Sequence, residues 1–240
     1  IRVFDELRAA GHEPKGIRLD SGDLAYLSKR ARRMLDEAGY PDAIICASGD
    51  LDEYLIASLK NQGAKIDLWG VGTKLITSAD MPALGGVYKL SALYPKEGGE
   101  VPKIKLSDNS DKITNPAFKD VYRIYDNKTG KAEADLIVVR GEKIDTGKPL
   151  TIFHPKDTWK RTTFTDYSVR QLTVPVIRGG KLVYELPPLS AICDYAEKEK
   201  ETFWDEYKRL DNPHVYKVDL SQKLYDIKNK LISEIRAENA

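Results

Sequence analysis

The stretch Gly16-Ile-Arg-Leu-Asp-Ser-Gly-Asp-Leu24 decides the fold class, because a short strand runs through a polar turn directly into a helix. The tetrapeptide Ser21-Gly-Asp-Leu24 recurs as Ser48-Gly-Asp-Leu51, again between an apolar run, Ala43–Ala47, and a helical pattern that extends to about Asn61. The run Ala43–Ala47 is continuous, which predicts a strand buried on both faces. The repeat therefore predicts two adjacent βα units whose matching loops lie at one edge of a sheet.

A third strand, Ile66–Trp69, leads into Gly70-Val-Gly-Thr73 and completes a βαβαβ order. Right-handed crossovers make such a sheet parallel, and the loops at the carboxyl ends of its strands form the ligand-binding edge. That edge collects the candidate site residues Arg18, Asp20, Ser48, Gly49, Asp50, Gly72 and Thr73. A cation, carboxylates and a glycine loop open to anions suit a phosphorylated sugar with vicinal hydroxyl groups.

Purely structural roles are the alternative for the same residues. Ser21 or Asp23 could cap the helix that follows, and Asp50 with Glu53 fits a capping box in which Asp50 is the N-cap. Arg18 and Asp20 point to the same side of a strand and could form a plain ion pair. The residues by themselves leave both interpretations open.

The rest of the chain has a different character. Residues 1–91 form the α/β part, whereas residues 92–189 contain alternating segments typical of antiparallel strands, such as 121–125, 135–139 and 150–153. Residues 190–240 predict two helices, one from Ser190 to Tyr207 and one from Ser221 to Glu238, each with its serine as N-cap. We expect three segments with these boundaries.

Composition excludes several function classes. Lys and Arg number 38 and Asp and Glu 37, so the net charge of +1 gives no overall field toward nucleic acid or an anionic membrane. Two cysteines do not make a disulfide framework, and they indicate a reducing compartment. His12, His154 and His214 lie too far apart in sequence for a zinc motif, so we assign no metal-ligating residue.

Several motifs, in their order along the chain, closely resemble the nicotinate phosphoribosyltransferase family: GIRLDSGDL, ASGDLDE, DLWGVGTKLITS, LGGVYKL and KIKLSDNSDKITNP. The resemblance covers nearly the whole chain. It implies an irregular type II phosphoribosyltransferase α/β barrel, followed by a β-rich region and C-terminal helices. It also implies the glycosyl transfer that opens NAD salvage, in which nicotinate and phosphoribosyl pyrophosphate give nicotinate mononucleotide and pyrophosphate with ATP hydrolysis and Mg²⁺.

The resemblance also suggests a role for each candidate residue. Arg18 resembles the arginine that contacts the nicotinate carboxylate, Asp20 the carboxylate beside the ribose and ring, and Asp50 one that binds ribose hydroxyls. Gly72 and Thr73 resemble the loop that holds the 5′-phosphate. Lys89 and Lys105 stand where related enzymes place lysines on the pyrophosphate. By the same resemblance, Arg18 and Asp20 are the catalytic candidates.

The chain begins at Ile1, inside the pattern of an amphipathic helix, so we expect the C-terminal part of a longer protein that is inactive alone. The family's phosphorylated histidine would then lie upstream, since none of the three histidines stands in its motif. By resemblance we expect a cytoplasmic homodimer. The alternatives are a sibling transferase for nicotinamide or quinolinate, and a non-catalytic module that binds phosphoribosyl groups.

Overall fold

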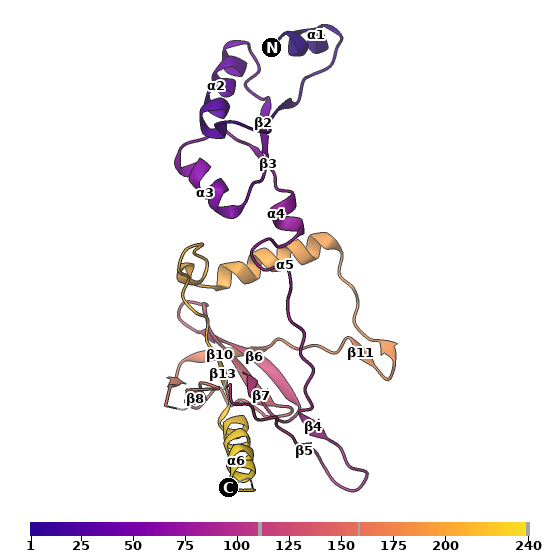
Figure 1. The fold of residues 1–240 in the computed structure, drawn as a ribbon, viewed down its shortest axis with the longest axis vertical. Helices are drawn as coiled ribbons and strands as arrows, with labels where there is room; N and C mark the ends of the chain where they lie inside the picture. Colours follow the sequence, from indigo (N-terminus) through magenta and orange to yellow (C-terminus); the bar gives the residue numbers. More distant parts are fainter. Residues whose placement is uncertain (110–111, 158, 239–240) are drawn as a thin grey trace. The chain divides into compact units, whose positions relative to one another are not determined.

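The computed structural model describes residues 1–109, 112–157 and 159–238 (Figure 1). Ser110 and Asp111, which belong to one of the quoted motifs, lie outside this description. The chain divides into two compact units, residues 1–86 and 87–240. The elements of the first unit are α1 (Arg2–Ala9), β1 (Gly16–Leu19), α2 (Leu24–Glu37), β2 (Ile44–Ser48), α3 (Glu53–Asn61), β3 (Leu68–Gly70) and α4 (Thr73–Ile76).

The first unit is a three-stranded parallel sheet in the order β1-β2-β3, which confirms the predicted βαβαβ arrangement. In a parallel sheet, the side chains of paired residues lie on the same face. Ile45 and Ala47 of β2 are fully buried on the face that the helices cover. Leu35 of α2 packs in the cluster with Ile45, and Leu59 of α3 packs in the cluster with Ala47. The helices therefore enclose one face of this sheet.

The other face of the sheet is open, so the prediction that β2 is buried on both faces is wrong for this chain. Ile44 of β2 is 42% exposed and Leu68 of β3 is 52% exposed. Arg18 of β1 pairs in register with Cys46, and Cys46 pairs with Leu68, so these three side chains share the open face. Arg18 thus stands in a row that the helices do not cover.

An aspartate directly before each of the helices α2 and α3 caps its first turn. Asp23 is the N-cap of α2 and accepts a hydrogen bond from the Tyr26 backbone N–H at 2.9 Å, as one structural alternative predicted. For α3 the N-cap is Asp52, which accepts from the Leu55 N–H at 2.8 Å, so the prediction that Asp50 caps this helix is wrong. Asp50 instead has a φ of 46° and remains in the turn before the cap.

The second unit is built on a six-stranded sheet in the order β10-β6-β7-β13-β8-β9. Its core is a cluster that includes Ile124, Leu136 and Ile152. The elements of this unit are β4 (Ala92–Leu93), β5 (Val101–Pro102), β6 (Lys119–Asp126), β7 (Ala132–Val139), β8 (Leu150–Phe153), β9 (Arg161–Phe164), β10 (Tyr167–Gln171), β11 (Ile177–Arg178), β12 (Lys181–Leu182), α5 (Leu189–Thr202), a 3-10 turn η2 (Asp205–Tyr207), β13 (Val218–Leu220) and α6 (Gln222–Glu238).

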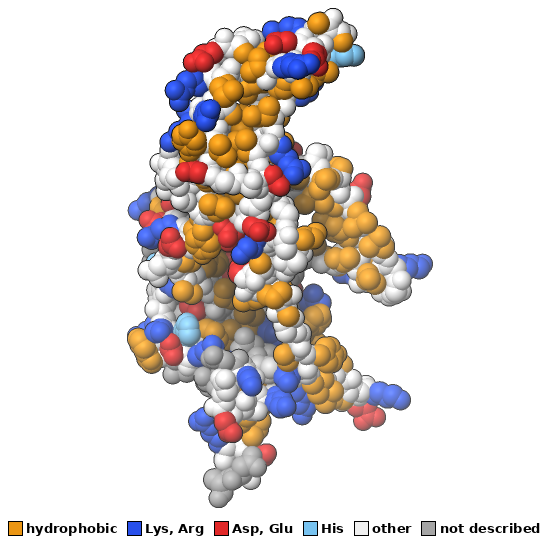
Figure 2. Space-filling model, turned by 45° about the horizontal axis from the view of Figure 1, so that its top comes forward, with side chains coloured by type: hydrophobic (Ala, Val, Ile, Leu, Met, Phe, Trp, Pro, Cys, Tyr) orange, Lys and Arg blue, Asp and Glu red, His pale blue; other side chains and the backbone are white. Residues whose placement is uncertain are grey.

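The β11–β12 hairpin stands out from the six-stranded sheet and carries mostly hydrophobic side chains (Figure 2). Ile177 is 69% exposed and Leu182 is 61% exposed.

Across the described ranges of the chain, no helix is both long enough and apolar enough to cross a membrane.

The first of the two C-terminal helices, α5, differs from the prediction at both of its ends, whereas α6 begins as predicted. The N-cap of α5 is Pro188 without a side-chain cap, so Ser190 lies inside the helix, and α5 ends at Thr202 instead of Tyr207. The predicted cap of α6 is correct, because the Ser221 hydroxyl accepts a hydrogen bond from the Leu224 N–H at 3.2 Å. Only the second of the two helices therefore begins with a side-chain cap.

Asp219 of β13 gives the second unit a pH-dependent stability. Its side chain is 3% exposed, and burial raises the pKa of the carboxyl, although the charges of His154 and Lys217 act in the opposite direction. A raised pKa means that the folded state binds the proton more tightly than the unfolded state, so stability is lost as the pH rises through the folded pKa. We expect Asp219→Asn to gain stability over the parent as the pH rises from about 4 toward 7.

Urea unfolding at a series of pH values measures this effect. The matched control is Asp211→Asn, since Asp211 is exposed. A constant difference between parent and Asp219→Asn at all pH values would contradict the prediction.

Candidate functional site

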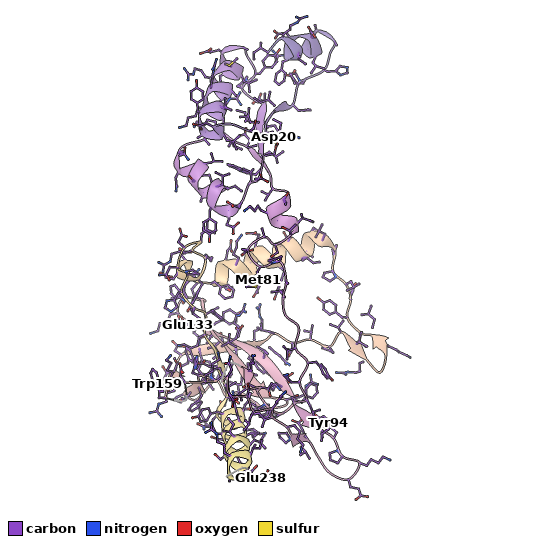
Figure 3. The ribbon with its side chains drawn as sticks, viewed as in Figure 1. Asp20, Met81, Tyr94, Glu133, Trp159 and Glu238 are labelled. Carbon is purple, nitrogen blue, oxygen red and sulfur yellow. The ribbon has the colours of Figure 1, made fainter. Side chains whose placement is uncertain are left out.

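The two Ser-Gly-Asp turns meet at the carboxyl edge of the parallel sheet, as their repetition predicted. They line a common cavity of about 490 Å³, to which both turns contribute all three of their residues. Asp20 lies at this edge, where β1 ends (Figure 3). The pairing of Arg18 with Cys46 and of Leu19 with Ala47 sets the register that brings the turns side by side.

Asp20 is the centre of the polar contacts in this cavity. Its Oδ1 accepts a hydrogen bond from the Ser48 hydroxyl and lies 3.2 Å from a guanidinium nitrogen of Arg18. The hydrogen bond from Ser48, followed by the charge of Arg18, lowers the pKa of the Asp20 carboxyl. Asp20 is therefore ionised at neutral pH, and the side chains of Asp20 and Arg18 are both more than half exposed.

Gly49 allows the second turn to lie against the first. Its φ is +100°, and a Cβ at this position would overlap the backbone oxygen of Asp20. Only a residue without a Cβ fits there, because the contact is with backbone that has no rotamer to change. The close approach of the two turns thus depends on a glycine in the second one.

The loop after β3 joins the same edge. Ser48 pairs with Gly70, so the loop that begins at Gly70 starts beside the second Ser-Gly-Asp turn. Gly72 is the N-cap of α4, and Thr73 is the exposed first residue of that helix. One residue further on, Lys74 lies 3.9 Å from the carboxylate of Asp52. Gly72 and Thr73 therefore follow the third strand end at this edge, but neither they nor Arg18 line the cavity between the turns. Of the candidate residues of this unit, the cavity lining contains Asp20, Ser48, Gly49 and Asp50.

Lys89 and Lys105 belong to the second unit. Both are exposed, and the backbone N–H of Lys105 donates to the Thr114 hydroxyl at 3.4 Å. Their roles, like those of the seven residues of the first unit, stay predictions.

Sequence reasoning missed the part of the site that α3 supplies. Leu55, Leu59 and Gln62 line the cavity between the turns. Their spacing of four and three residues places them on one face of a helix, which is a signal that the sequence contains. The cavity is therefore polar where the turns contribute and partly apolar where α3 closes it.

The arrangement suits an anionic ligand with hydroxyl groups. Arg18 offers guanidinium N–H groups beyond the one near Asp20, and ionised Asp20 can accept from hydroxyls. Within residues 1–109, 112–157 and 159–238, no three His, Cys, Asp or Glu side chains are grouped as a metal site would need. Arg18 and Asp20 together supply donors for an anion and an acceptor for hydroxyl groups.

Known proteins resemble this chain along most of its length. Residues 118–228 match the family described as "Nicotinate phosphoribosyltransferase C-terminal domain". The chain is 47% identical over 222 residues to a nicotinate phosphoribosyltransferase of Bacillus subtilis. The aligned region covers 92% of this chain and 45% of that protein. It is 35% identical over 246 residues to one of Dictyostelium discoideum, covering 96% of this chain and 41% of that protein.

A solved structure shares the fold. The crystal structure of human nicotinic acid phosphoribosyltransferase matches 92% of this chain and 41% of its own, with a TM-score of 0.69 and 24% sequence identity. The mixed α/β fold is therefore confirmed by a structural relative. The chain spans less than half the length of each of these three relatives.

Proposed function

Residues 118–228 of this chain are a C-terminal domain of the nicotinate phosphoribosyltransferase family, and from that premise we propose that the chain serves in the transfer of a phosphoribosyl group to nicotinate. The observation that carries the proposal is the shared cavity of the two Ser-Gly-Asp turns, with ionised Asp20 between Ser48 and Arg18. In the reaction, the ring nitrogen of nicotinate attacks C1 of phosphoribosyl pyrophosphate. The bond from C1 to the pyrophosphate oxygen breaks, and pyrophosphate leaves with the electron pair.

The charges of the edge fit the charge that develops in this step. As the bond to pyrophosphate breaks, C1 and the ribose ring become positive, and fixed carboxylates beside them stabilise the transition state. Asp20 takes this position, while Asp50 accepts from ribose hydroxyls. Arg18 holds the carboxylate of nicotinate with guanidinium N–H groups not engaged by Asp20. Nicotinate is itself the nucleophile, so the protein supplies no covalent intermediate.

The remaining groups of the proposal hold phosphates. Gly72 and Thr73 bind the 5′-phosphate, and Lys89 and Lys105 bind the pyrophosphate. Mg²⁺ commonly binds through one or two carboxylates together with substrate phosphates, and Asp20 and Asp50 fit such a set. When bound, Mg²⁺ neutralises charge on the leaving pyrophosphate. ATP hydrolysis accompanies the transfer in this proposal.

The proposal extends to the surroundings of the site. We place the three-stranded sheet in an irregular α/β barrel, and the open sheet face that carries Arg18 supports this placement. A cytoplasmic homodimer completes the proposal and rests on the family resemblance alone.

The phosphate role of Thr73 has a direct test. We expect Thr73→Val to weaken the binding of phosphoribosyl pyrophosphate about tenfold or more, because a hydrogen bond to a charged group contributes about 1.5–3 kcal/mol. Isothermal titration of the complete protein measures the affinity, and circular dichroism verifies the fold. Thr77→Val, one turn further along the chain, is the control, since the Thr77 hydroxyl donates only to the Thr73 carbonyl in the described structure.

Two results would overturn the proposal. Unchanged affinity in Thr73→Val removes the phosphate role of this loop. A complete protein that converts nicotinamide in preference to nicotinate refutes the assignment of the acceptor, because Arg18 is placed here to bind a carboxylate.

A further inference from the structure

A second polar cavity lies in the second unit, beside the strands β8, β9 and β13. We call it the β9 pocket. It has a volume of about 390 Å³, and its lining includes His154, Trp159, Lys160, Arg161, Lys217 and Asp219. None of the residues proposed for the transfer site lines the β9 pocket, so this pocket has no role assigned by that proposal.

The pocket contains a buried carboxylate that lacks a partner. Asp219 is 3% exposed, and its Oδ1 is one of two buried side-chain oxygen atoms in the described part of the chain that have no hydrogen-bond partner. Buried polar atoms are almost always hydrogen-bonded, so an orphaned one calls for an explanation. A ligand that donates an O–H or N–H to this carboxylate supplies one.

The rim of the pocket is cationic. Lys160 forms an ion pair with Asp157 at 2.5 Å, and Lys217 donates to the Thr162 hydroxyl at 2.8 Å. Among the described residues, neither Arg161 nor Lys217 forms an ion pair with a carboxylate. Arg161 is exposed and Lys217 is half-buried, so two cations remain available to an anion that enters the pocket.

Aromatic side chains flank these charges. Trp159 lies at the outer side of this unit and is 77% exposed (Figure 3), and the ammonium of Lys160 stands 4.9 Å from its ring centroid. His154 accepts a backbone hydrogen bond from Asp157 on Nδ1 at 2.9 Å, so in the neutral ring the hydrogen is on Nε2. An exposed indole beside cations offers a flat surface on which a base or a sugar ring can stack.

We propose that the β9 pocket binds a phosphate monoester whose organic part carries hydroxyl or amino hydrogens, as in a sugar phosphate or a mononucleotide. The phosphate lies between Arg161 and Lys217. An O–H or N–H of the organic part donates to Asp219, and its ring lies against Trp159.

Charge and hydrogen bonding select this class over simpler ligands. An anion without an O–H group, such as sulfate, satisfies Arg161 and Lys217 but has no hydrogen to donate to the carboxylate of Asp219. A cation satisfies the carboxylate and is repelled by the three basic side chains of the rim. A phosphate monoester with donor groups satisfies both sets, because its two ends differ in charge and in hydrogen-bonding character.

Titration of three probes tests the proposal. Ribose 5-phosphate, adenosine 5′-monophosphate and inorganic sulfate are titrated calorimetrically into the full chain, all in an Asp20→Ala, Thr73→Val background that weakens the transfer site. We expect the two esters to bind at least tenfold more tightly than sulfate, which has no hydrogen to donate to Asp219. Equal affinities of the two esters assign the pocket to sugar phosphates, and a tighter nucleotide with quenched Trp159 fluorescence assigns it to mononucleotides.

Variants assign the binding to the pocket. We expect Arg161→Met to weaken both esters at least tenfold, and Asp219→Asn to weaken the esters while it does not weaken the binding of sulfate. Arg178→Met, an exposed arginine of β11, is the control and keeps the parent affinities. Unchanged ester binding in Arg161→Met, or sulfate that binds as tightly as the esters, would overturn the proposal whatever the transfer activity of the protein.

Discussion

Asp20→Ala is expected to lower kcat/KM for the formation of nicotinate mononucleotide by about two to three orders of magnitude. A fixed group that stabilises transition-state charge contributes on the order of 10²–10³ in rate. Asp20 meets the requirements of such a group, since it is ionised, lies at the strand end and is held by Ser48 and Arg18. The measurement is a steady-state assay of the complete protein with nicotinate and phosphoribosyl pyrophosphate.

The variant Ser48→Ala tests whether the reaction requires the carboxyl group of Asp20 in its ionised form or whether Asp20 has only a structural role. The hydrogen bond from Ser48 is the largest cause of the lowered pKa of Asp20, so its loss raises that pKa. If the rate needs ionised Asp20, the acidic limb of the pH–rate profile moves to higher pH in Ser48→Ala. Asp42→Ala, at an exposed position of the same unit, is the control. An Asp20→Ala protein of parent activity would exclude Asp20 from the reaction.

The second large effect is expected for Gly49→Ala, which should destabilise the first unit by about 2–4 kcal/mol and reduce transfer with it. Two terms add in this estimate. A side chain at a positive φ costs about 1–2 kcal/mol, and the forced overlap with the Asp20 backbone adds a similar cost. Urea unfolding followed by circular dichroism measures the first effect, and the assay above measures the second.

Two further glycines separate these terms. Gly39 has a φ of +80°, and a Cβ added there would meet nothing within 4 Å, so Gly39→Ala isolates the conformational cost, about 1–2 kcal/mol. Gly86 has open space and no positive φ, so Gly86→Ala reports the background. A Gly49→Ala protein no less stable than Gly39→Ala would show that the turns do not need their close approach.

The sequence was sufficient for the features that depend on local signals. The βαβαβ order follows from apolar runs and helical spacing, and the shared edge follows from the repeated Ser-Gly-Asp turn. The N-cap of α3 could not be chosen in the same way, because Asp50 and Asp52 both suit the position by residue type. The choice depends on the turn itself, in which Gly49 and Asp50 both have a positive φ.

Features that depend on distant contacts left no local signal. The helix expected up to Tyr207 ends at Thr202, because Phe203 leaves it to pack edge-on against Tyr216, with ring centroids 5.1 Å apart. The next residue, Trp204, also lies outside the helix, and its indole N–H donates a hydrogen bond to the Glu133 carboxylate at 3.1 Å. Likewise, a run of apolar residues does not tell which partner covers the second face of a strand, and Ile44 and Leu68 remain exposed in this chain.

The position of β13 has a consequence for how the second unit is made. This strand of residues 218–220 lies between β7 and β8 in the middle of the six-stranded sheet, parallel to one and antiparallel to the other. On the ribosome, β10-β6-β7 and β8-β9 can form as two separate ribbons, but no strand joins them until β13 has emerged. The six-stranded sheet is therefore completed only after residues 218–220 have left the ribosome, and a nascent chain held before Val218 should be cleaved readily by proteases between its two halves.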